Sequence, residues 1–205
     1  MTVKQVYLIR HAQPDYPDGK MMCLGQKIDL PLSALGFEQA QLLKQYFAHL
    51  PIEAVYTSPL LRARQTAEAV AGSRPIHMLD DLIELSGGEW DGLTFDQLHA
   101  RYPEYFGQNP LFSCPPGGEN DESGLARMYA ALAHIDKHTE RCAAIVSHSG
   151  LIRTLLCDLL GRLPCEKKKV PQDCASFSLL EWRDGRWSVR RINVKPDPEN
   201  LTILP

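Results

Sequence analysis

The order of apolar and polar residues along the chain predicts strands and helices in alternation. Short apolar runs between polar residues predict buried strands at 4–9, 53–58, 74–79 and 141–147. Apolar periodicity and capping residues predict helices at 33–50, 58–72, 94–101, 121–137 and 149–161. Strands that alternate with helices in this way predict an α/β domain with a largely parallel central sheet.

Two segments carry the most specific local signals. Ser58 is placed to cap the helix at 58–72, and Pro59 is suited to its first turn. Residues 174–194 predict a β-hairpin that turns at Asp184–Gly185. We expect this hairpin to add antiparallel strands to the sheet.

Length, charge and cysteine usage narrow the class of protein. The 205 residues suit one domain over 1–205, with an irregular tail at about 195–205. A net charge of −3 gives no reason to expect nucleic acid or a membrane surface as partner. No apolar run approaches the ~20 residues of a membrane span, and the start of the chain does not match a signal peptide. The six cysteines form no C-x-x-C pair, so we expect reduced thiols, a cytoplasmic location, and neither a metal nor another cofactor.

Reactive side chains follow three of the predicted strands. Arg10 and His11 come directly after the first strand, Arg62 follows the second, and His148 follows the fourth. Ligands of α/β domains bind beyond the carboxyl ends of the strands, so we expect these side chains at one site. The alternative is that each histidine caps its own strand and bonds locally. Arg64 lies about 200° around the helix from Arg62, so only one of these two arginines can face the crevice.

Glu84 is the candidate carboxyl group for this site. It follows an apolar pair and precedes a glycine-rich turn, where partial desolvation suits acid–base chemistry. Spacing alone does not exclude four nearby competitors, which we expect to be mostly solvated: Asp80, Asp81, Glu89 and Asp91. Two histidines, two arginines and a carboxyl group suit phosphoryl transfer without a metal. A neutral imidazole would attack phosphorus, and the carboxylic acid would protonate the leaving oxygen and then activate water.

Six motifs in order resemble those of the histidine phosphatase (phosphoglycerate mutase-like) superfamily. They are "LIRHAQ", "LGQKIDLPLSALGFEQA", "VYTSPLLRARQTAE", "LIELSGGEWDG", "PPGGEN" and "VSHSG". The resemblance runs over about residues 4–160 and implies a three-layer α/β/α sandwich with a phosphohistidine mechanism. The catalytic residues it implies are His11 as nucleophile, Glu84 as proton donor, and Arg10, Arg62 and His148 as the rest of the phosphate pocket. We expect substrate contacts from residues within the matching motifs, namely Gln13, Gly25 and Ser149.

Two residues depart from the family pattern. Ala12 stands where the family has the glycine of "RHG", which matters only if the position needs a positive φ, and Ser149 stands where it has the first glycine of "HGG". Residues 85–100 contain no Lys or Arg, whereas mutases of the family carry a basic insertion there, so the sequence favours hydrolysis over mutase transfer. A binding module without turnover is a third hypothesis, but such a module would not need an acid at Glu84.

Residues 10–33 resemble the α-ribazole phosphatase-like members of the superfamily. We expect a small phosphorylated metabolite as ligand, with α-ribazole phosphate as one candidate and a homodimer as one option for assembly. Segments 13–30 and 102–120 are expected to close the site. Their apolar side chains would either form a substrate wall or pack the loops on the core: Met21, Met22, Leu24, Tyr102, Tyr105, Phe106, Leu111 and Phe112. The run Lys167–Lys168–Lys169 is interpreted as a solvated loop.

Overall fold

Six strands form one central sheet in the computed structural model, which describes residues 4–106 and 114–197. Their order across the sheet is β3-β2-β4-β1-β5-β6. The strands are β1 Lys4–Arg10, β2 Ala54–Thr57, β3 Ile76–Met78, β4 Cys142–Ser147, β5 Phe177–Arg183 and β6 Arg186–Val194. The first four are mutually parallel, and β5 and β6 add antiparallel pairs, which confirms the predicted α/β sheet with its closing hairpin.

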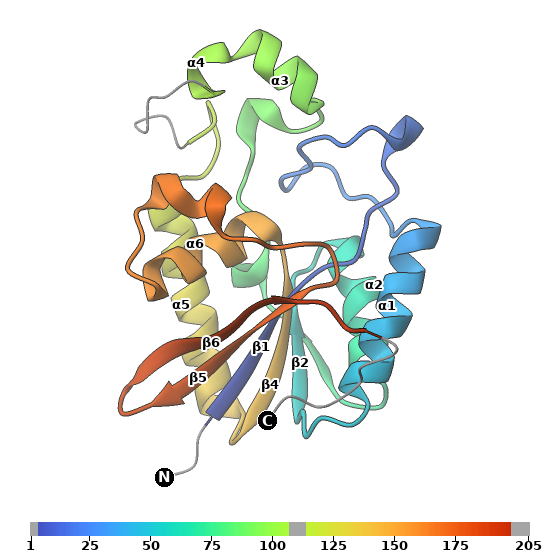
Figure 1. Ribbon diagram of the computed structural model, residues 1–205, viewed down its shortest axis with the longest axis vertical. Coiled ribbons are helices and arrows are strands. Elements are labelled where there is room, and N and C mark those ends of the chain that lie inside the picture. The colour runs from blue at the N-terminus through green and yellow to red at the C-terminus, as the bar shows by residue number, and fades with distance from the viewer. Residues whose placement is uncertain (1–3, 107–113, 198–205) are drawn as a thin grey trace.

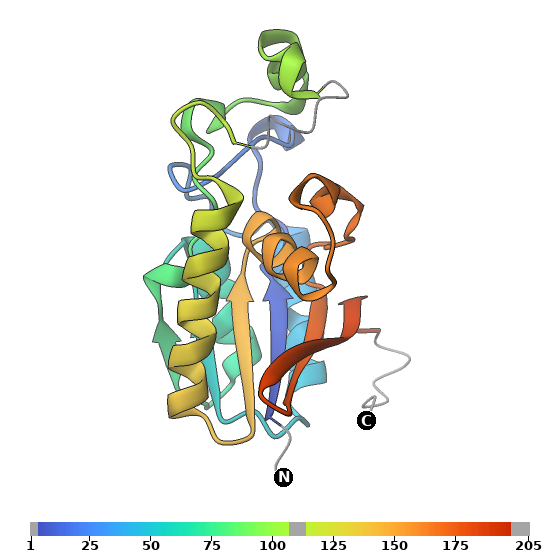
Figure 2. The same ribbon diagram turned by 90° about the vertical axis from the view of Figure 1, so that its left-hand side faces the viewer.

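Helices cover both faces of the sheet and complete the three-layer sandwich (Figures 1 and 2). The long helices of the described residues are α1 Ala34–Phe47, α2 Leu61–Ala71, α5 Asp121–His138 and α6 Ser149–Leu159. Alternation along β1 feeds a hydrophobic core on each face. Tyr7 and Ile9 pack with α1 and α2, whereas Val6 and Leu8 pack with α5 and α6.

Strand register brings the two predicted histidines together. The parallel pairing of β1 with β4 sets Arg10 opposite Ser147. His11 directly follows Arg10, and His148 directly follows Ser147. The two histidines therefore lie side by side at the carboxyl edge of the sheet. Their ring centroids lie 5.1 Å apart.

Short helices and loops lie beyond this carboxyl edge (Figure 1). They are α3 Phe95–Arg101, α4 Pro103–Phe106 and the 3-10 helices η1 Pro17–Gly19, η2 Asp80–Leu82, η3 Gly88–Trp90 and η4 Pro164–Lys169. Thr94 caps α3, because its hydroxyl accepts the Gln97 N–H at 3.3 Å while the Gln97 side chain accepts the Thr94 N–H at 2.9 Å. The sequence pattern predicted α3 but neither α4 nor η4.

The helix predicted at 58–72 begins later than its apparent cap suggests. The N-cap position of α2 is Leu60, so Ser58 does not cap the helix. Asp29, on a loop distant in sequence, caps the helix instead, because its carboxylate accepts the Leu61 N–H at 2.7 Å. Ser58 is instead fully buried and faces His148.

Some predicted features lie at or beyond the limits of the described residues. Leu111 and Phe112 belong to residues 107–113, which lie outside the described residues. The same holds for residues 198–205 of the predicted tail, and the rest of that tail, 195–197, belongs to no helix or strand. Among the helices that the structure describes, none has the length and hydropathy to cross a membrane.

Candidate active site

His11 is held as a neutral imidazole with one nitrogen available. Its Nδ1 lies 2.7 Å from the carbonyl oxygen of Ala12. A carbonyl can only accept, so Nδ1 must carry the proton and Nε2 keeps its lone pair. Burial lowers the pKa of His11 well below its usual value, and the positive charges of Arg62 and Arg10 lower it further. The imidazole is therefore uncharged near pH 7 and can act as a nucleophile through Nε2.

Arg62 is fixed by backbone carbonyls rather than by a carboxylate. Its side chain is 1% exposed, Nη2 donates to the Gly25 carbonyl at 2.9 Å, and Nη1 donates to the Ile28 carbonyl at 3.0 Å. Asp29 lies at 3.8 Å, beyond hydrogen-bond distance. Arg64 is exposed, so of the two arginines on this helix Arg62 is the one that lines the cavity.

Arg10 is the last residue of β1 and directly precedes His11. Its Nη1 donates to the Gln172 carbonyl at 2.6 Å. The Nε atoms of Arg10 and Arg62 are both buried without a hydrogen-bond partner. Buried charged donors without partners are costly, so these groups fit an anionic ligand that supplies several acceptor oxygens.

His148 lies behind His11 at the N-terminus of α6. Its Nε2 is 2.7 Å from the Ser58 hydroxyl, which accepts the Leu60 N–H at 3.3 Å and has a proton of its own that it can donate to Nε2. With the hydroxyl as donor, the ring proton stands on Nδ1, which is buried and has no partner. Burial lowers the pKa of His148 well below its usual value, and the charge of Arg62 adds to the effect. His148 is fully buried and is not among the residues that line the cavity, unlike His11, Arg10, Arg62 and Glu84.

Glu84 is held against the first turn of α6. Its Oε1 accepts the N–H groups of Leu85 at 2.9 Å and Leu151 at 3.0 Å, and its Oε2 accepts the Gly150 N–H at 3.1 Å. A Cβ atom at position 150 would lie only 2.7 Å from Oε1, so this approach requires a glycine. None of the four competing acidic residues lines the cavity, whereas Glu84 does.

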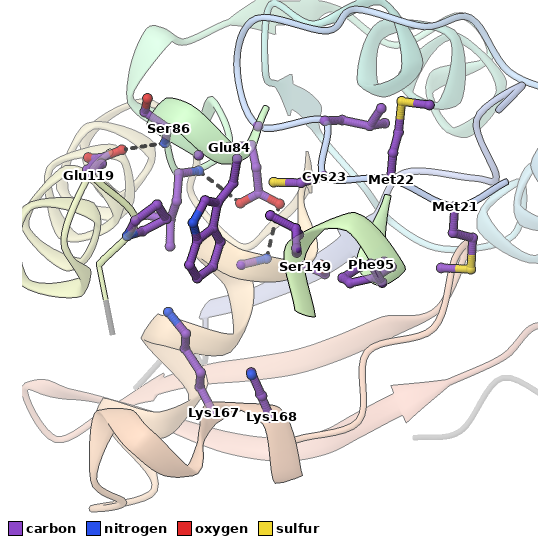
Figure 3. Close-up of a pocket in the computed structure, with 18 of the residues that line it drawn as sticks. Met21, Met22, Cys23, Glu84, Ser86, Phe95, Glu119, Ser149, Lys167 and Lys168 are labelled. Carbon is purple, nitrogen blue, oxygen red and sulfur yellow. Dashed lines mark hydrogen bonds between the residues drawn. The ribbon is translucent and has the colours of Figure 1, made fainter. Parts of the chain in front are cut away.

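The site opens into a cavity of about 740 Å³ (Figure 3). Figure 3 shows Glu84 and Ser149 at the cavity, with Lys167 and Lys168 reaching toward it from η4. The predicted apolar wall is present in part through Met21, Met22, Leu24 and Tyr105. Tyr102 does not line the cavity; its hydroxyl donates to Glu89 at 2.9 Å.

Sequence reasoning missed several residues that line this cavity. Trp90 and Phe95 extend its apolar wall, and the lysine run interpreted as a solvated loop lies on η4 at its rim. The aromatic character of Trp90 and Phe95, close to the glycine-rich turn, was the one available signal for the wall. The sequence could not predict that the lysines lie at the cavity rim, because their place depends on how α6 and the 3-10 helix η4 pack.

The three predicted substrate contacts differ in their placement. Gly25 and Ser149 line the cavity, whereas Gln13 does not. The backbone of Gln13 is occupied by loop contacts, since its N–H donates to Gln39 at 2.9 Å and its carbonyl accepts the Ser33 N–H at 3.0 Å. Ala12 is fully buried and does not have a positive φ, so its methyl group brings no backbone strain beside the nucleophile.

Comparison with known proteins agrees with this geometry. The family model of the histidine phosphatase superfamily (branch 1) matches residues 6–195. The chain belongs to this superfamily. Phosphoserine phosphatase 1 of Hydrogenobacter thermophilus is 29% identical over 93% of this chain and 92% of its own length. The histidine phosphatase described here is therefore a phosphatase, and so a hydrolase.

Solved structures show the same fold. The mycobacterial glucosyl-3-phosphoglycerate phosphatase is 25% identical, with a TM-score of 0.81 over 94% of this histidine phosphatase and 100% of that chain. Bacillus stearothermophilus YhfR is 27% identical, with a TM-score of 0.82 over 92% and 96% of the two chains. The α-ribazole phosphatase from Shigella flexneri has a TM-score of 0.79 at 24% identity, over 93% and 96%. Two of these three structures, the first and the third, are named for different substrates on one fold.

Proposed function

We propose that this histidine phosphatase is a metal-independent phosphomonoesterase that acts through a phosphohistidine on His11. The observation that carries the proposal is the tautomer of His11, whose Nδ1 is 2.7 Å from the Ala12 carbonyl so that Nε2 keeps a lone pair. Arg10 and Arg62 supply positive charge to the phosphoryl oxygens, which is the role a metal would otherwise fill.

The reaction takes place in two displacements. His11 Nε2 attacks phosphorus, the bond from phosphorus to the ester oxygen breaks, and Glu84 in its acid form gives a proton to the leaving alcohol. Water then attacks the phosphohistidine, Glu84 takes a proton from that water, and inorganic phosphate leaves with Nε2 restored. His148 donates Nδ1–H to a phosphoryl oxygen in both steps.

The substrate is proposed to be a phosphomonoester with a sizeable organic group. A cavity of about 740 Å³ with an apolar wall is far larger than a phosphate ion needs, which supports a bulky alcohol such as that of α-ribazole phosphate. A small metabolite as partner, a homodimer and a cytoplasmic location stay predictions.

Hydrolysis of p-nitrophenyl phosphate in excess EDTA tests the reaction class. The proposal expects phosphate release that chelator does not change, and His11→Ala should lower kcat by several orders of magnitude. Activity lost with EDTA and restored by a divalent cation would refute the metal-independent route. A phosphoryl group transferred to a second alcohol without release of phosphate would favour a mutase, and stoichiometric phosphate binding with no turnover would favour a binding module.

A further inference from the structure

Asp91 is a carboxylate that the proposed chemistry does not use. It was expected to be solvated, but it is only partly exposed, and its Oδ2 is buried without a hydrogen-bond partner. Burial raises the pKa of Asp91, while the backbone N–H groups of Lys27 and Gln26 oppose that rise. Keeping a carboxylate in such a position costs free energy, which indicates that Asp91 has a packing or positioning role.

The Asp91 side chain lies between two cavity loops, and each loop carries a glycine where it approaches the carboxylate. A Cβ atom at Gly25 would lie 1.9 Å from Asp91 Oδ1, and a Cβ atom at Gly87 would lie 2.1 Å from the same oxygen. The Cys23 thiol approaches this oxygen at 3.8 Å, and burial raises the pKa of Cys23 to about 12, so the thiol stays protonated and can donate. Asp91 therefore fills the space between residues 23–25 and the glycine-rich turn.

Backbone bonds on either side hold the same two segments together. The Cys23 N–H donates to the Leu93 carbonyl at 2.9 Å, and the Gly92 N–H donates to the Cys23 carbonyl at 2.7 Å. Gln26 Nε2 donates to the Glu84 carbonyl at 2.7 Å, and Lys27 Nζ donates to the Gly88 carbonyl at 3.1 Å. We call these two hydrogen-bonded segments, residues 23–27 and 84–93, the seam, and Asp91 lies within it.

The seam reaches the phosphate pocket through one residue. Gly25, which contacts Asp91, offers its carbonyl to Arg62 Nη2 at 2.9 Å. A shift of Gly25 would therefore move the acceptor that orients the guanidinium. We propose that Asp91 is a positioning residue, which fixes the Gly25 carbonyl and through it aims Arg62 at the phosphoryl group of the substrate. This inference rests on the proposed function for the identity of the bound anion.

Binding of inorganic orthovanadate, measured by calorimetry, tests the proposal without requiring turnover. Asp91→Ala should raise the Kd of orthovanadate about tenfold, since it frees the Gly25 loop, whereas Asp91→Asn keeps the shape and should stay within about threefold of the unchanged protein. Asp96→Asn, an exposed acid on α3, is the matched control and should leave the Kd unchanged.

Coupling to Arg62 separates positioning from a purely structural role. In an Arg62→Lys background, which cannot make the same pair of carbonyl bonds, Asp91→Ala should change the Kd less than about twofold. An equal effect in both backgrounds, or an unchanged Kd in Asp91→Ala, overturns the proposal. Should Asp91→Ala fail to fold, Gly87→Ala displaces the same carboxylate and should weaken binding about tenfold; unchanged binding there also overturns it. Failure of the proposed function would instead appear as no ester hydrolysis by the unchanged protein.

Discussion

The contact between Gly150 and Glu84 gives the sharpest test of the proton donor. A methyl group at position 150 would lie 2.7 Å from Glu84 Oε1 and 3.2 Å from its carboxyl carbon. An ordinary carbon–oxygen contact is about 3.4 Å, so Gly150→Ala must push the carboxylate back by about 0.7 Å. The push also lengthens the bonds that Glu84 accepts from the N–H groups of Gly150 and Leu151.

The expected cost depends on the leaving group. A displacement of nearly 1 Å costs a catalytic group about 100-fold in rate when its proton is needed. We expect Gly150→Ala to lower kcat about 100-fold for an alkyl phosphate, whose alkoxide leaves poorly without a proton. For p-nitrophenyl phosphate, whose leaving group needs little protonation, the loss should be tenfold or less.

The assay compares kcat for the two esters, with Glu84→Gln as the positive control and thermal unfolding as the check on folding. Both variants should show the same dependence on the leaving group. Equal losses for both esters in a folded Gly150→Ala variant would refute Glu84 as proton donor.

Three further predictions follow from the same geometry. Folding lowers the pKa values of His11 and His148, so below pH 6.5 the unfolded chain binds more protons than the folded protein. The free energy of unfolding should therefore fall with decreasing pH, by up to about 1.4 kcal/mol per pH unit for each histidine. Urea unfolding at several pH values should show that this pH dependence is weaker in His148→Ala. Ser58→Ala removes the hydroxyl partner of His148 Nε2 and should lower kcat about tenfold with little change in KM, measured on p-nitrophenyl phosphate; unchanged kcat would contradict the tautomer assignment. Asp29→Ala removes the carboxylate that accepts the Leu61 N–H and should cost about 1 kcal/mol in the free energy of unfolding, whereas no loss would show that water replaces this cap.

The sequence was sufficient for features that depend on local pattern. Alternating apolar runs predicted the strands, and the common carboxyl edge of parallel strands predicted that His11 and His148 would meet. The Asp184–Gly185 pair also predicted the hairpin turn, since such turns need residues that tolerate a positive φ. The structure confirms it, with φ angles of 54° and 79° at these two residues.

Features set by distant segments could not be predicted. Ser58 has the composition of a helix cap, but its hydroxyl goes to His148, which is 90 positions away along the chain. The capping carboxylate comes from Asp29, on a loop whose path no periodicity describes. Asp91 is partly buried between Gly25 and Gly87, where a side chain on either loop would overlap its carboxylate, so its environment depends on tertiary packing rather than on its neighbours in sequence.

The most direct test of the central claim is to trap the covalent intermediate. Rapid acid-free quenching of the unchanged protein with a 32P-labelled phosphomonoester, in excess EDTA, should give a phosphoprotein that is stable to alkali and labile to acid, with the label on His11. His11→Ala should carry no label. Steady turnover of the unchanged protein without any labelled intermediate, or label and turnover retained by His11→Ala, would contradict the phosphohistidine mechanism.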